Sequence, residues 1–325
     1  MCTAITYQTK NFYFGRNLDL HISYGEKVVI TPRNYPFHFR NGLTLKNHYA
    51  MIGMASVFDG YPLYYEATNE KGLSVAGLNF PDNATYYPSV ENLDNIAPFE
   101  LMLWLLGQCA TVEEASELLD RMNLWDMPFS DQLPLTPLHW LIADRKRSIV
   151  LEPLTEGLKI FENPVGILTN NPPFEYHMYN LVNYMNITAQ IPQNRFSEKI
   201  TMKPYSLGMG GIGLPGDLSS SSRFVKAAFT KLNSVCSDSE SESISQFFHI
   251  LGSVTQQRGL TLVESGEYEY TIYSSCCNTD KGIYYYRTYN NNQINAVAMF
   301  AEDLNSDQLI SYPLMEGQQI NMQNG

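Results

Sequence analysis

Hydrophobic positions alternate with polar ones, or cluster in β-branched and aromatic runs, through the first part of the chain. Between Thr3 and Phe80, turn residues separate the runs TAITYQ, NFYFGRN, EKVVITPR, YAMIGMASVF, YPLYYEAT and LSVAGLNF. A period of two with β-branched and aromatic enrichment is typical of strands. The pattern therefore predicts antiparallel strands throughout this region.

The hydrophobic period then changes to that of helices. PFELMLWLLGQ (98–108) has helical apolar spacing, and TVEEASELLDRM (111–122) begins with Thr111 and Glu114 at the spacing of a capping box. Such a box satisfies free backbone N–H groups at the start of a helix. Two consecutive helices are expected here.

Strands return after the proline-rich connection MPFSDQLPLTP, in LHWLIADR, SIVLEPL and GLKIFEN. Farther on, SSSSRFVKAAFTKLN and SISQFFHILGSV are typical of Ser-capped helices, EYEYTIYSS and GIYYYRTY of closing strands, and the acidic SVCSDSESES of a solvated loop. Blocks of strands between pairs of helices argue against regular βαβ alternation. They favour an α+β fold with two sheets between two helix layers.

Composition narrows the class of protein. The 325 residues, 17% charged and 44% hydrophobic, can form one large core, and because no linker divides them we expect a single domain over residues 1–325. The net charge of −12 argues against a nucleic-acid partner, since phosphates require clustered Lys and Arg. No leader-like or 18-residue apolar segment occurs. We therefore expect a cytoplasmic protein with no membrane insertion.

Three motifs suggest chemistry that their context does not support. GMGGIG (208–213) fits the dinucleotide fingerprint, but LPGD follows it where a helix should continue, so a flexible Gly-rich loop is favoured. No two of the six histidines have zinc-ligand spacing. Cys276 and Cys277 are adjacent in a strand-like run, whose side chains alternate between faces, so we expect one buried thiol and one idle one. All five cysteines suit a reducing compartment because their number is odd and no metal-like spacing relates them.

Cys2 has a different position, directly behind the initiator methionine. Removal of Met1 would leave one residue with both a thiol and a free α-amine. An α-amine, with an ordinary pKa of about 7.7–8, can accept the thiol proton near neutral pH. Cys2 is therefore a candidate nucleophile that carries its own base. The alternative is that a chain begins Met-Cys by chance.

Four further residues could complete such a site. FGRNLDL places Arg16 and Asp19 on a strand-like segment that could pair with the first strand. The guanidinium would favour a thiolate, and the carboxylate could hold the α-ammonium; the alternative is an ordinary surface ion pair. Attack on an amide also needs donors aimed at the oxyanion. Asn79 in AGLNFP and Asn170 in LTNNP, each at a strand end, are candidates, although asparagine is common in turns.

With these residues assembled, the chain resembles the conjugated bile salt hydrolases of the choloylglycine hydrolase family, which are N-terminal-nucleophile (Ntn) cysteine hydrolases. The resemblance spans nearly the whole chain, in MCTAI, YFGRNLD, NEKGLSVAGLNFP, LPLTPLHWLIAD, GILTNNP, GIGLPGD, SSRFVKAAFTKLNS, SQFFHILGSV and YTIYSSC. It implies an αββα four-layer sandwich of two antiparallel sheets between helix layers. It also implies hydrolysis of glycine- and taurine-conjugated bile salts through a thioester, without a metal or organic cofactor.

The same resemblance implies roles for individual residues. Cys2 would be the nucleophile and Asp19 would contact its α-amine, while Asn79 and Asn170 would contribute to the oxyanion hole. The two arginines, Arg16 and Arg223, would organise the surroundings of the thiol. The steroid would contact a set of loop and strand residues: Leu18, Tyr24, Phe58, Tyr65, Phe129, Leu133, Thr136 and Leu138.

Two alternative functions have to be weighed against bile salt hydrolysis. A penicillin V acylase would use the same chemistry, but penicillin-directed relatives tend to carry Tyr at the position of Asn79. A non-catalytic oligomer component would leave the polar constellation around Cys2 unexplained.

Relatives form homotetramers through a protruding loop, here about 184–215, and several carry Arg at the position of Leu207. A cation there could favour taurine's sulfonate, so its absence favours glycine conjugates.

Overall fold

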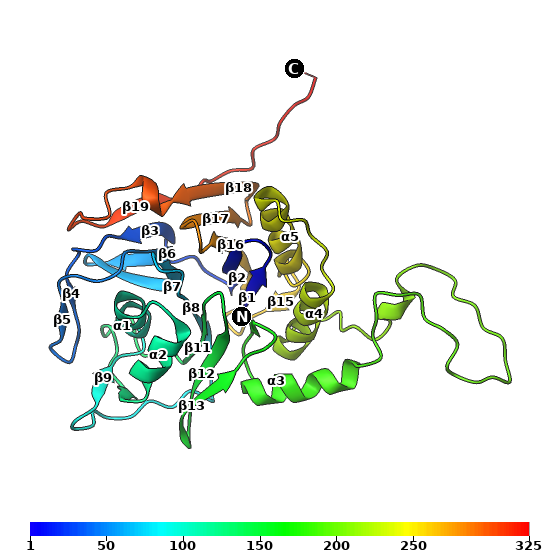
Figure 1. The fold of residues 1–325 in the computed structure, drawn as a ribbon, viewed down its shortest axis with the longest axis horizontal. Helices are drawn as coiled ribbons and strands as arrows, with labels where there is room; N and C mark the ends of the chain where they lie inside the picture. The colour runs from blue at the N-terminus through cyan, green and yellow to red at the C-terminus, as the bar shows by residue number, and fades with distance from the viewer. Residues whose placement is uncertain (325) are drawn as a thin grey trace.

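Two antiparallel sheets lie face to face at the centre of the structure, a computed structural model that describes residues 1–324 (Figure 1). The first sheet has the order β14-β1-β2-β16-β17-β18, and β15 also pairs with β16. Its strands are β1 (Cys2–Gln8), β2 (Phe12–Leu20), β14 (Ile167–Leu168), β15 (Thr261–Leu262), β16 (Tyr268–Asn278), β17 (Ile283–Thr288) and β18 (Asn291–Ala298).

The second sheet has the order β13-β12-β11-β8-β7-β6-β3-β19. Its strands are β3 (Lys27–Thr31), β6 (Met51–Phe58), β7 (Tyr61–Asn69), β8 (Ser74–Asn79), β11 (Leu138–Ala143), β12 (Ser148–Leu154), β13 (Gly157–Glu162) and β19 (Ile310–Pro313). Two short pairs lie outside these sheets: β4 (Phe37–His38) with β5 (Thr44–Leu45), and β9 (Asp94–Ile96) with β10 (Met122–Leu124).

Helices cover the outer face of each sheet. α4 (Ser220–Leu232) and α5 (Glu240–Gly252) pack on the first sheet, against β1, β14 and β16. α1 (Leu101–Gln108) contacts β7 and β8 of the second sheet, and α2 (Val112–Leu119) shares its apolar core. One core joins both sheets to α4 and α5, and another joins the second sheet to α1 and α2. The predicted α+β, αββα four-layer arrangement is confirmed.

The predicted capping box is present at the start of α2. Thr111 Oγ1 accepts from the Glu114 backbone nitrogen at 3.2 Å, and the Glu114 carboxylate accepts from the backbone nitrogen of Ala110 at 2.6 Å. The helix ends at Leu119, earlier than expected, because the chain continues into β10. The Ser caps of α4 and α5 are in place as residues, Ser219 and Ser239, although neither side chain bonds to its helix backbone.

Two sequence predictions are corrected by the layered arrangement. Cys276 and Cys277 are both buried, at 0% and 2% exposure, because β16 has helices on one face and the other sheet on its opposite face. The acidic segment predicted as a solvated loop is helical in its second half, where Glu240 opens α5 and Ser243 is fully buried. The short helix α3 (Phe174–Asn180) and the edge strands β18 and β19 were not predicted.

A long arm leaves the body after α3 and the 3-10 turn η1 (Leu181–Tyr184) and returns before α4 (Figure 1). Its most exposed apolar side chains are Met185, Phe196, Tyr205 and Leu207. Residues 208–213 lie in this arm as a loop with the 3-10 turn η2 (Met209–Gly211), so the Gly-rich loop interpretation is correct. Gly210 is required there, since a Cβ would lie 2.2 Å from the Gln190 carbonyl oxygen.

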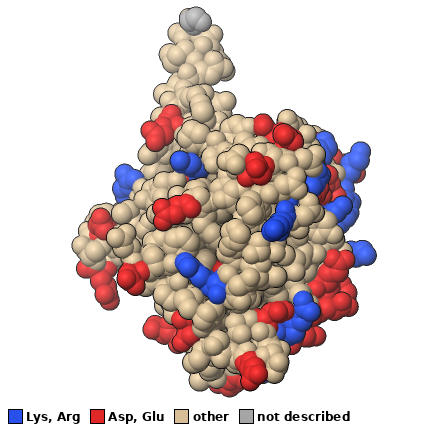
Figure 2. Space-filling model, turned by 90° about the vertical axis from the view of Figure 1, so that its left-hand side faces the viewer, with Lys and Arg blue, Asp and Glu red and all other residues tan. Residues whose placement is uncertain are grey.

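The two ends of the chain differ in their surroundings. The N-terminus lies beside the first sheet within the body, whereas the segment after β19 extends away from it (Figure 1). Basic and acidic side chains are interleaved on the face shown in Figure 2, and wide areas carry neither. Within residues 1–324, no helix combines the length and apolar character needed to cross a membrane.

Candidate active site

Cys2 is the first residue of β1 and is only 3% exposed. It pairs with Leu18 across the ladder to β2, and Ala4 pairs with Arg16. Residues two apart on a strand share a face, as do directly paired residues. Cys2, Arg16 and Leu18 therefore all lie on one face of the first sheet.

Arg16 reaches from the first sheet to the second. Its Nη1 donates to the backbone oxygens of Tyr65 at 2.9 Å and Gly77 at 2.6 Å. Glu66 lies 3.9 Å from its Nε, and both side chains are almost fully buried. Burial opposes the charge of Arg16, but Cys2, Tyr273, Glu66 and Asp19 together raise its pKa above the ordinary value. A fixed cation is thus held beside the candidate nucleophile.

Asp19, the second charged residue of β2 near Cys2, lies beside the N-terminal ammonium. Its Oδ1 accepts from Thr271 Oγ1 at 2.6 Å, while Oδ2 is buried without a hydrogen-bond partner among residues 1–324. Burial raises the pKa of Asp19, although the terminal ammonium, Arg223 and Thr271 oppose that effect. The ammonium of Met1 donates to the Asp19 backbone oxygen at 2.8 Å and contacts Glu269.

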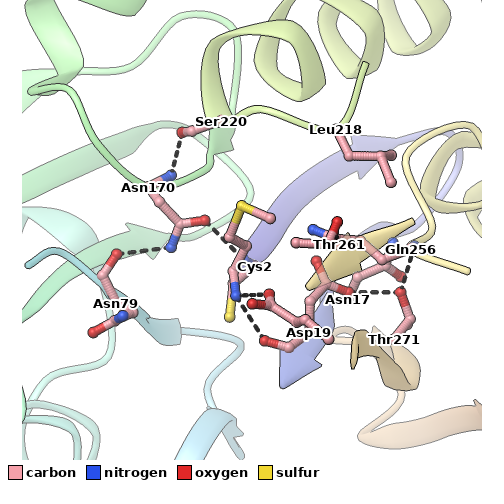
Figure 3. A network of polar contacts seen from close by, with 12 residues as sticks. Cys2, Asn17, Asp19, Asn79, Asn170, Leu218, Ser220, Gln256, Thr261 and Thr271 are labelled. Atoms are coloured by element: carbon pink, nitrogen blue, oxygen red, sulfur yellow. Dashed lines mark hydrogen bonds and ion pairs between the residues drawn. The ribbon is translucent and has the colours of Figure 1, made fainter. Parts of the chain in front are cut away.

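Asn170 connects the remaining polar residues to Cys2 (Figure 3). Its Oδ1 accepts from the Cys2 backbone nitrogen and from Arg223 Nη2, each at 2.8 Å. Its Nδ2 donates to the backbone oxygen of Asn79 at 2.7 Å. No hydrogen bond within residues 1–324 engages the exposed side-chain amide of Asn79, so this amide is available to a ligand.

Arg223 is buried behind Cys2, on the α4 side of the first sheet. It donates to the Cys2 backbone oxygen, to Thr3 Oγ1 at 2.7 Å, and through Nε to the Leu218 oxygen at 3.0 Å. Together with its bond to Asn170, these contacts hold Arg223 against the backbone of Cys2. The structure therefore brings together all six residues singled out in the sequence: Cys2, Arg16, Asp19, Asn79, Asn170 and Arg223.

This arrangement can perform acyl transfer. A thiol at a strand end, a neighbouring cation and amide groups within reach are what a cysteine nucleophile and its oxyanion require. Within residues 1–324, no three His, Cys, Asp or Glu side chains are grouped closely enough to hold a metal ion.

Residues 2–312 match the family model described as linear amide C–N hydrolases, choloylglycine hydrolase family. The chain belongs to this family. It is therefore an enzyme, a linear amide C–N hydrolase. Two curated relatives of this choloylglycine hydrolase match it over nearly its whole length. A "Bile salt hydrolase/transferase" of Lactiplantibacillus plantarum is 60% identical over 97% of both chains. One of Clostridium perfringens is 38% identical over 99% of both.

Solved structures agree with the fold of this choloylglycine hydrolase. A mutant conjugated bile acid hydrolase from Clostridium perfringens superposes with a TM-score of 0.93 at 37% identity, covering 100% of both chains. A penicillin V acylase from Agrobacterium tumefaciens gives a TM-score of 0.76 at 19% identity, covering 97% of this chain and 92% of that one. At that identity the likeness to the acylase shows a shared fold alone.

The eight expected substrate residues of this choloylglycine hydrolase lie in three places. Leu18 pairs with Cys2 in the first sheet and Leu138 pairs with Asn79 in the second, and Cys2, Asn79 and Leu138 are each the terminal residue of a strand. Tyr24 and Tyr65 both contact Ser56 Oγ, through a backbone oxygen and a phenol respectively. The rings of Phe58 and Phe129 are 6.4 Å apart, and Leu133 and Thr136 follow in the same loop as Phe129.

Several residues that position the site could not be found from sequence. Thr271 holds Asp19, Ser220 Oγ accepts from the Asn170 backbone nitrogen at 2.8 Å, and Glu66 lies beside Arg16. His177 Nε2 donates to the Asn170 backbone oxygen at 2.9 Å. Thr271, Ser220 and Glu66 are ordinary polar residues in elements predicted for other reasons, and His177 lies in the unpredicted helix α3. The folded arrangement alone gives each of them a partner in the site.

Proposed function

We propose that this enzyme hydrolyses the amide bond of glycine- and taurine-conjugated bile salts, releasing the free bile acid and the amino acid. The observation that carries the proposal is the 60% identity to a bile salt hydrolase/transferase over 97% of both chains. The polar constellation around Cys2 supports it with the chemistry that an amide substrate requires.

The reaction would proceed through a thioester. After removal of Met1, Cys2 Sγ attacks the carbonyl carbon of the bile acid amide, and the α-amine takes the thiol proton. Collapse of the tetrahedral intermediate breaks the C–N bond as the α-ammonium gives this proton to the departing amine. Water then attacks the thioester, its proton returns through the α-amine, and the free acid leaves the regenerated thiol.

The surrounding groups would each have one task. Asp19 Oδ2, buried and unpartnered within residues 1–324, suits an α-ammonium placed on the Cys2 nitrogen. Asn170 Oδ1, already 2.8 Å from that nitrogen, would orient it. The side-chain amide of Asn79 would donate to the oxyanion from the opposite side, with the Asn170 amide close by.

The steroid would lie on the apolar side of this site. We assign its contacts to the residues near Cys2, Ser56 and the 127–137 loop, because they combine apolar surface with a few polar atoms. These are Leu18, Tyr24, Phe58, Tyr65, Phe129, Leu133, Thr136 and Leu138. A penicillin V acylase remains the second candidate for the same chemistry, and Asn79, in place of the tyrosine typical of penicillin-directed relatives, favours bile salts.

The test is amine release by the purified enzyme from glycocholate and taurocholate, with penicillin V assayed in parallel. Release of glycine or taurine with little penicillin cleavage is the expected result. Penicillin cleavage with inert bile conjugates would retain the Cys2 mechanism and overturn the substrate assignment. We also expect faster glycine release, since Leu207 supplies no cation for a sulfonate; a taurine-to-glycine ratio well above one would contradict this.

We further propose that the enzyme works in the cytoplasm as a homotetramer. Five free thiols are compatible with a reducing compartment. The arm exposes Phe196, Tyr205 and Leu207 at more than 80% each, and apolar side chains presented in this way favour burial against another subunit. Sedimentation of the intact chain, compared with a chain carrying Phe196→Ser and Tyr205→Ser, tests the assembly. A monomeric wild-type enzyme would contradict it.

A further inference from the structure

A wholly buried polar cluster lies between the two sheets, beside Arg16. Its centre is the carboxylate of Glu66 on β7, which is 1% exposed. Glu66 accepts from Tyr273 Oη at 2.7 Å, from Ser275 Oγ at 2.8 Å, and from Tyr284 Oη. All three donors belong to the opposite sheet and are at most 1% exposed.

Arg16 and Glu66 cross the space between the sheets in opposite directions. Arg16 extends from the first sheet to two carbonyl oxygens of the second, at Tyr65 and Gly77. Glu66 extends from the second sheet to three hydroxyls of the first. The two charges are 3.9 Å apart at their closest and form no hydrogen bond with each other. Each is therefore oriented by its own set of neutral dipoles.

Such a cluster is costly in an apolar core. Replacing a buried ion pair by packed hydrophobic side chains is commonly neutral or stabilising, so stability alone does not account for it. Two carboxylates, Glu66 and Asp19, balance the charge of Arg16, and without Glu66 this buried cation next to Cys2 would lose part of its counter-charge while the thiol is protonated. The three hydroxyl donors around Glu66 favour its ionised form.

We propose that Glu66 is a positioning residue that acts on the nucleophile through Arg16: by balancing part of the Arg16 charge from 3.9 Å away, it sets the pH range in which the Cys2 thiol ionises. This inference rests on the proposed role of Cys2. It assigns to Glu66 a function in the reaction although the side chain touches neither Cys2 nor substrate.

The charged and titratable neighbours of the three groups are few. Glu66 faces Arg16, Tyr273, Tyr284 and Cys277; Arg16 faces Cys2, Glu66, Asp19 and Tyr273; and Cys2 faces Arg16 and Arg223. Burial raises the pKa of Glu66, and Arg16 with the three hydroxyl donors opposes this. Removing the Glu66 charge leaves Arg16 with less negative charge around it, since Asp19 remains but Glu66 does not, so a thiolate at Cys2 becomes easier to form.

The decisive measurement is the rate of iodoacetamide alkylation of Cys2 as a function of pH, followed by mass spectrometry of the N-terminal peptide. For Glu66→Gln, the pH of half-maximal rate is expected to fall by on the order of one to two units, as a lost unit charge several ångströms away requires. Glu66→Asp keeps the charge and should remain near the wild-type value. Coincident wild-type and Glu66→Gln profiles, or equal shifts in both variants, would overturn the proposal.

A matched control is available on the same stretch of chain. Glu70 is also a largely buried carboxylate paired with an arginine, Arg33, but its partners Arg33 and Ala50 belong to no part of the site. Glu70→Gln should leave the Cys2 alkylation profile unchanged. A shift as large as that of Glu66→Gln would indicate a general effect of destabilisation and contradict the specific role.

A second variant covers failure of Glu66→Gln to fold. Glu66→Met with Tyr273→Phe and Tyr284→Phe replaces the cluster by apolar groups of similar shape, which is the exchange that cores tolerate best. Ser275 Oγ retains the Arg16 backbone nitrogen as a partner, at 3.1 Å. The same fall in the alkylation midpoint is expected, and its absence would overturn the proposal. Because alkylation requires no bile salt, a wrong substrate assignment would leave this test intact.

Discussion

The side-chain oxygen of Asn170 accepts a 2.8 Å hydrogen bond from the backbone nitrogen of Cys2. This bond joins the first residue of β1 to the residue two positions after β14 ends, across a gap of 168 residues in the chain. Arg223 donates to the same oxygen, so three segments distant in sequence meet at one atom. The position of the Cys2 nitrogen is thereby determined by tertiary structure, and the following predictions start from it.

Replacing Asn170 by Ala should lower kcat/KM for glycocholate by roughly 10²–10³-fold, the usual effect of losing an oxyanion-site amide. Arg223 would also lose one of its acceptors, so the free energy of unfolding should fall by about 1–3 kcal/mol. Asn183→Ala is the control, since within residues 1–324 the exposed Asn183 side chain bonds only to Asn180. Equal activities of the two variants would exclude Asn170 from the mechanism.

Replacing Cys2 by Ala should abolish hydrolysis, with a loss of more than about 10⁴-fold in kcat, because no other group can form the thioester. The circular dichroism spectrum should be unchanged. Cys236→Ala removes a partly buried thiol in the connection between α4 and α5 and should retain full activity. Residual turnover of Cys2→Ala comparable to the wild type would mean that Cys2 is not the nucleophile.

His177 should make the fold sensitive to acid. Burial lowers its pKa to about 4, since the ring stacks on Phe224 and, among residues 1–324, Nδ1 has no hydrogen-bond partner while Nε2 bonds to the Asn170 oxygen. In the unfolded chain the imidazole titrates near its ordinary 6.5. Between these values the unfolded state binds more protons, so stability is full above about pH 6.5 and falls as the pH approaches 4.

The measurement is urea unfolding at pH 7 and pH 4.5 for the wild type and for His177→Gln. The wild type should lose about 2–3 kcal/mol more than the variant over this interval, because the glutamine does not titrate. His38→Gln alters an exposed histidine and should lose as much as the wild type. Identical losses in wild type and His177→Gln would contradict the prediction.

Gly15 should tolerate no side chain. A Cβ at this position of β2 would lie 2.1 Å from the Ser275 backbone oxygen, and backbone atoms of β16 cannot move aside without opening the sheet beneath Arg16. Gly15→Ala should therefore lower the free energy of unfolding by at least about 3 kcal/mol. Gly216 has nothing within 4 Å of its Cβ position, so Gly216→Ala should be nearly neutral in the same denaturation experiment.

Local patterns were enough to predict the layers. Alternation identified most strands of both sheets, helical apolar spacing identified α1, and apolar stripes behind Thr or Ser identified α2, α4 and α5. The errors arise where tertiary structure overrides local preference. Cys277 is buried only because a second sheet covers its face, and Glu240 enters a helix because Asn278 and Lys281 bind its carboxylate. Edge strand β19 depends on pairing with β3, which lies far earlier in the chain.

The residues of the candidate site also divide into those that the sequence could identify and those whose role depends on tertiary contacts. Cys2, Arg16 and Asp19 could be related to one another from sequence, because neighbouring strands bring them together. Asn79 and Asn170 were candidates from their places at strand ends, whereas Arg223 could be assigned only through resemblance to the family. Glu66, Thr271 and His177 had no signal, since their importance comes from partners in other elements. Side chains that support a site through a single tertiary contact have no spacing rule to reveal them.

The unequal surroundings of the two chain ends limit how this enzyme can be handled. Any peptide fused before Cys2 would have to pass between Asp19 and Glu269 and would cap the nitrogen that we propose as the base. The final segment, by contrast, extends into solvent away from both sheets. Affinity tags, surface immobilisation and fusion partners therefore belong after residue 324, where they leave the nucleophile untouched.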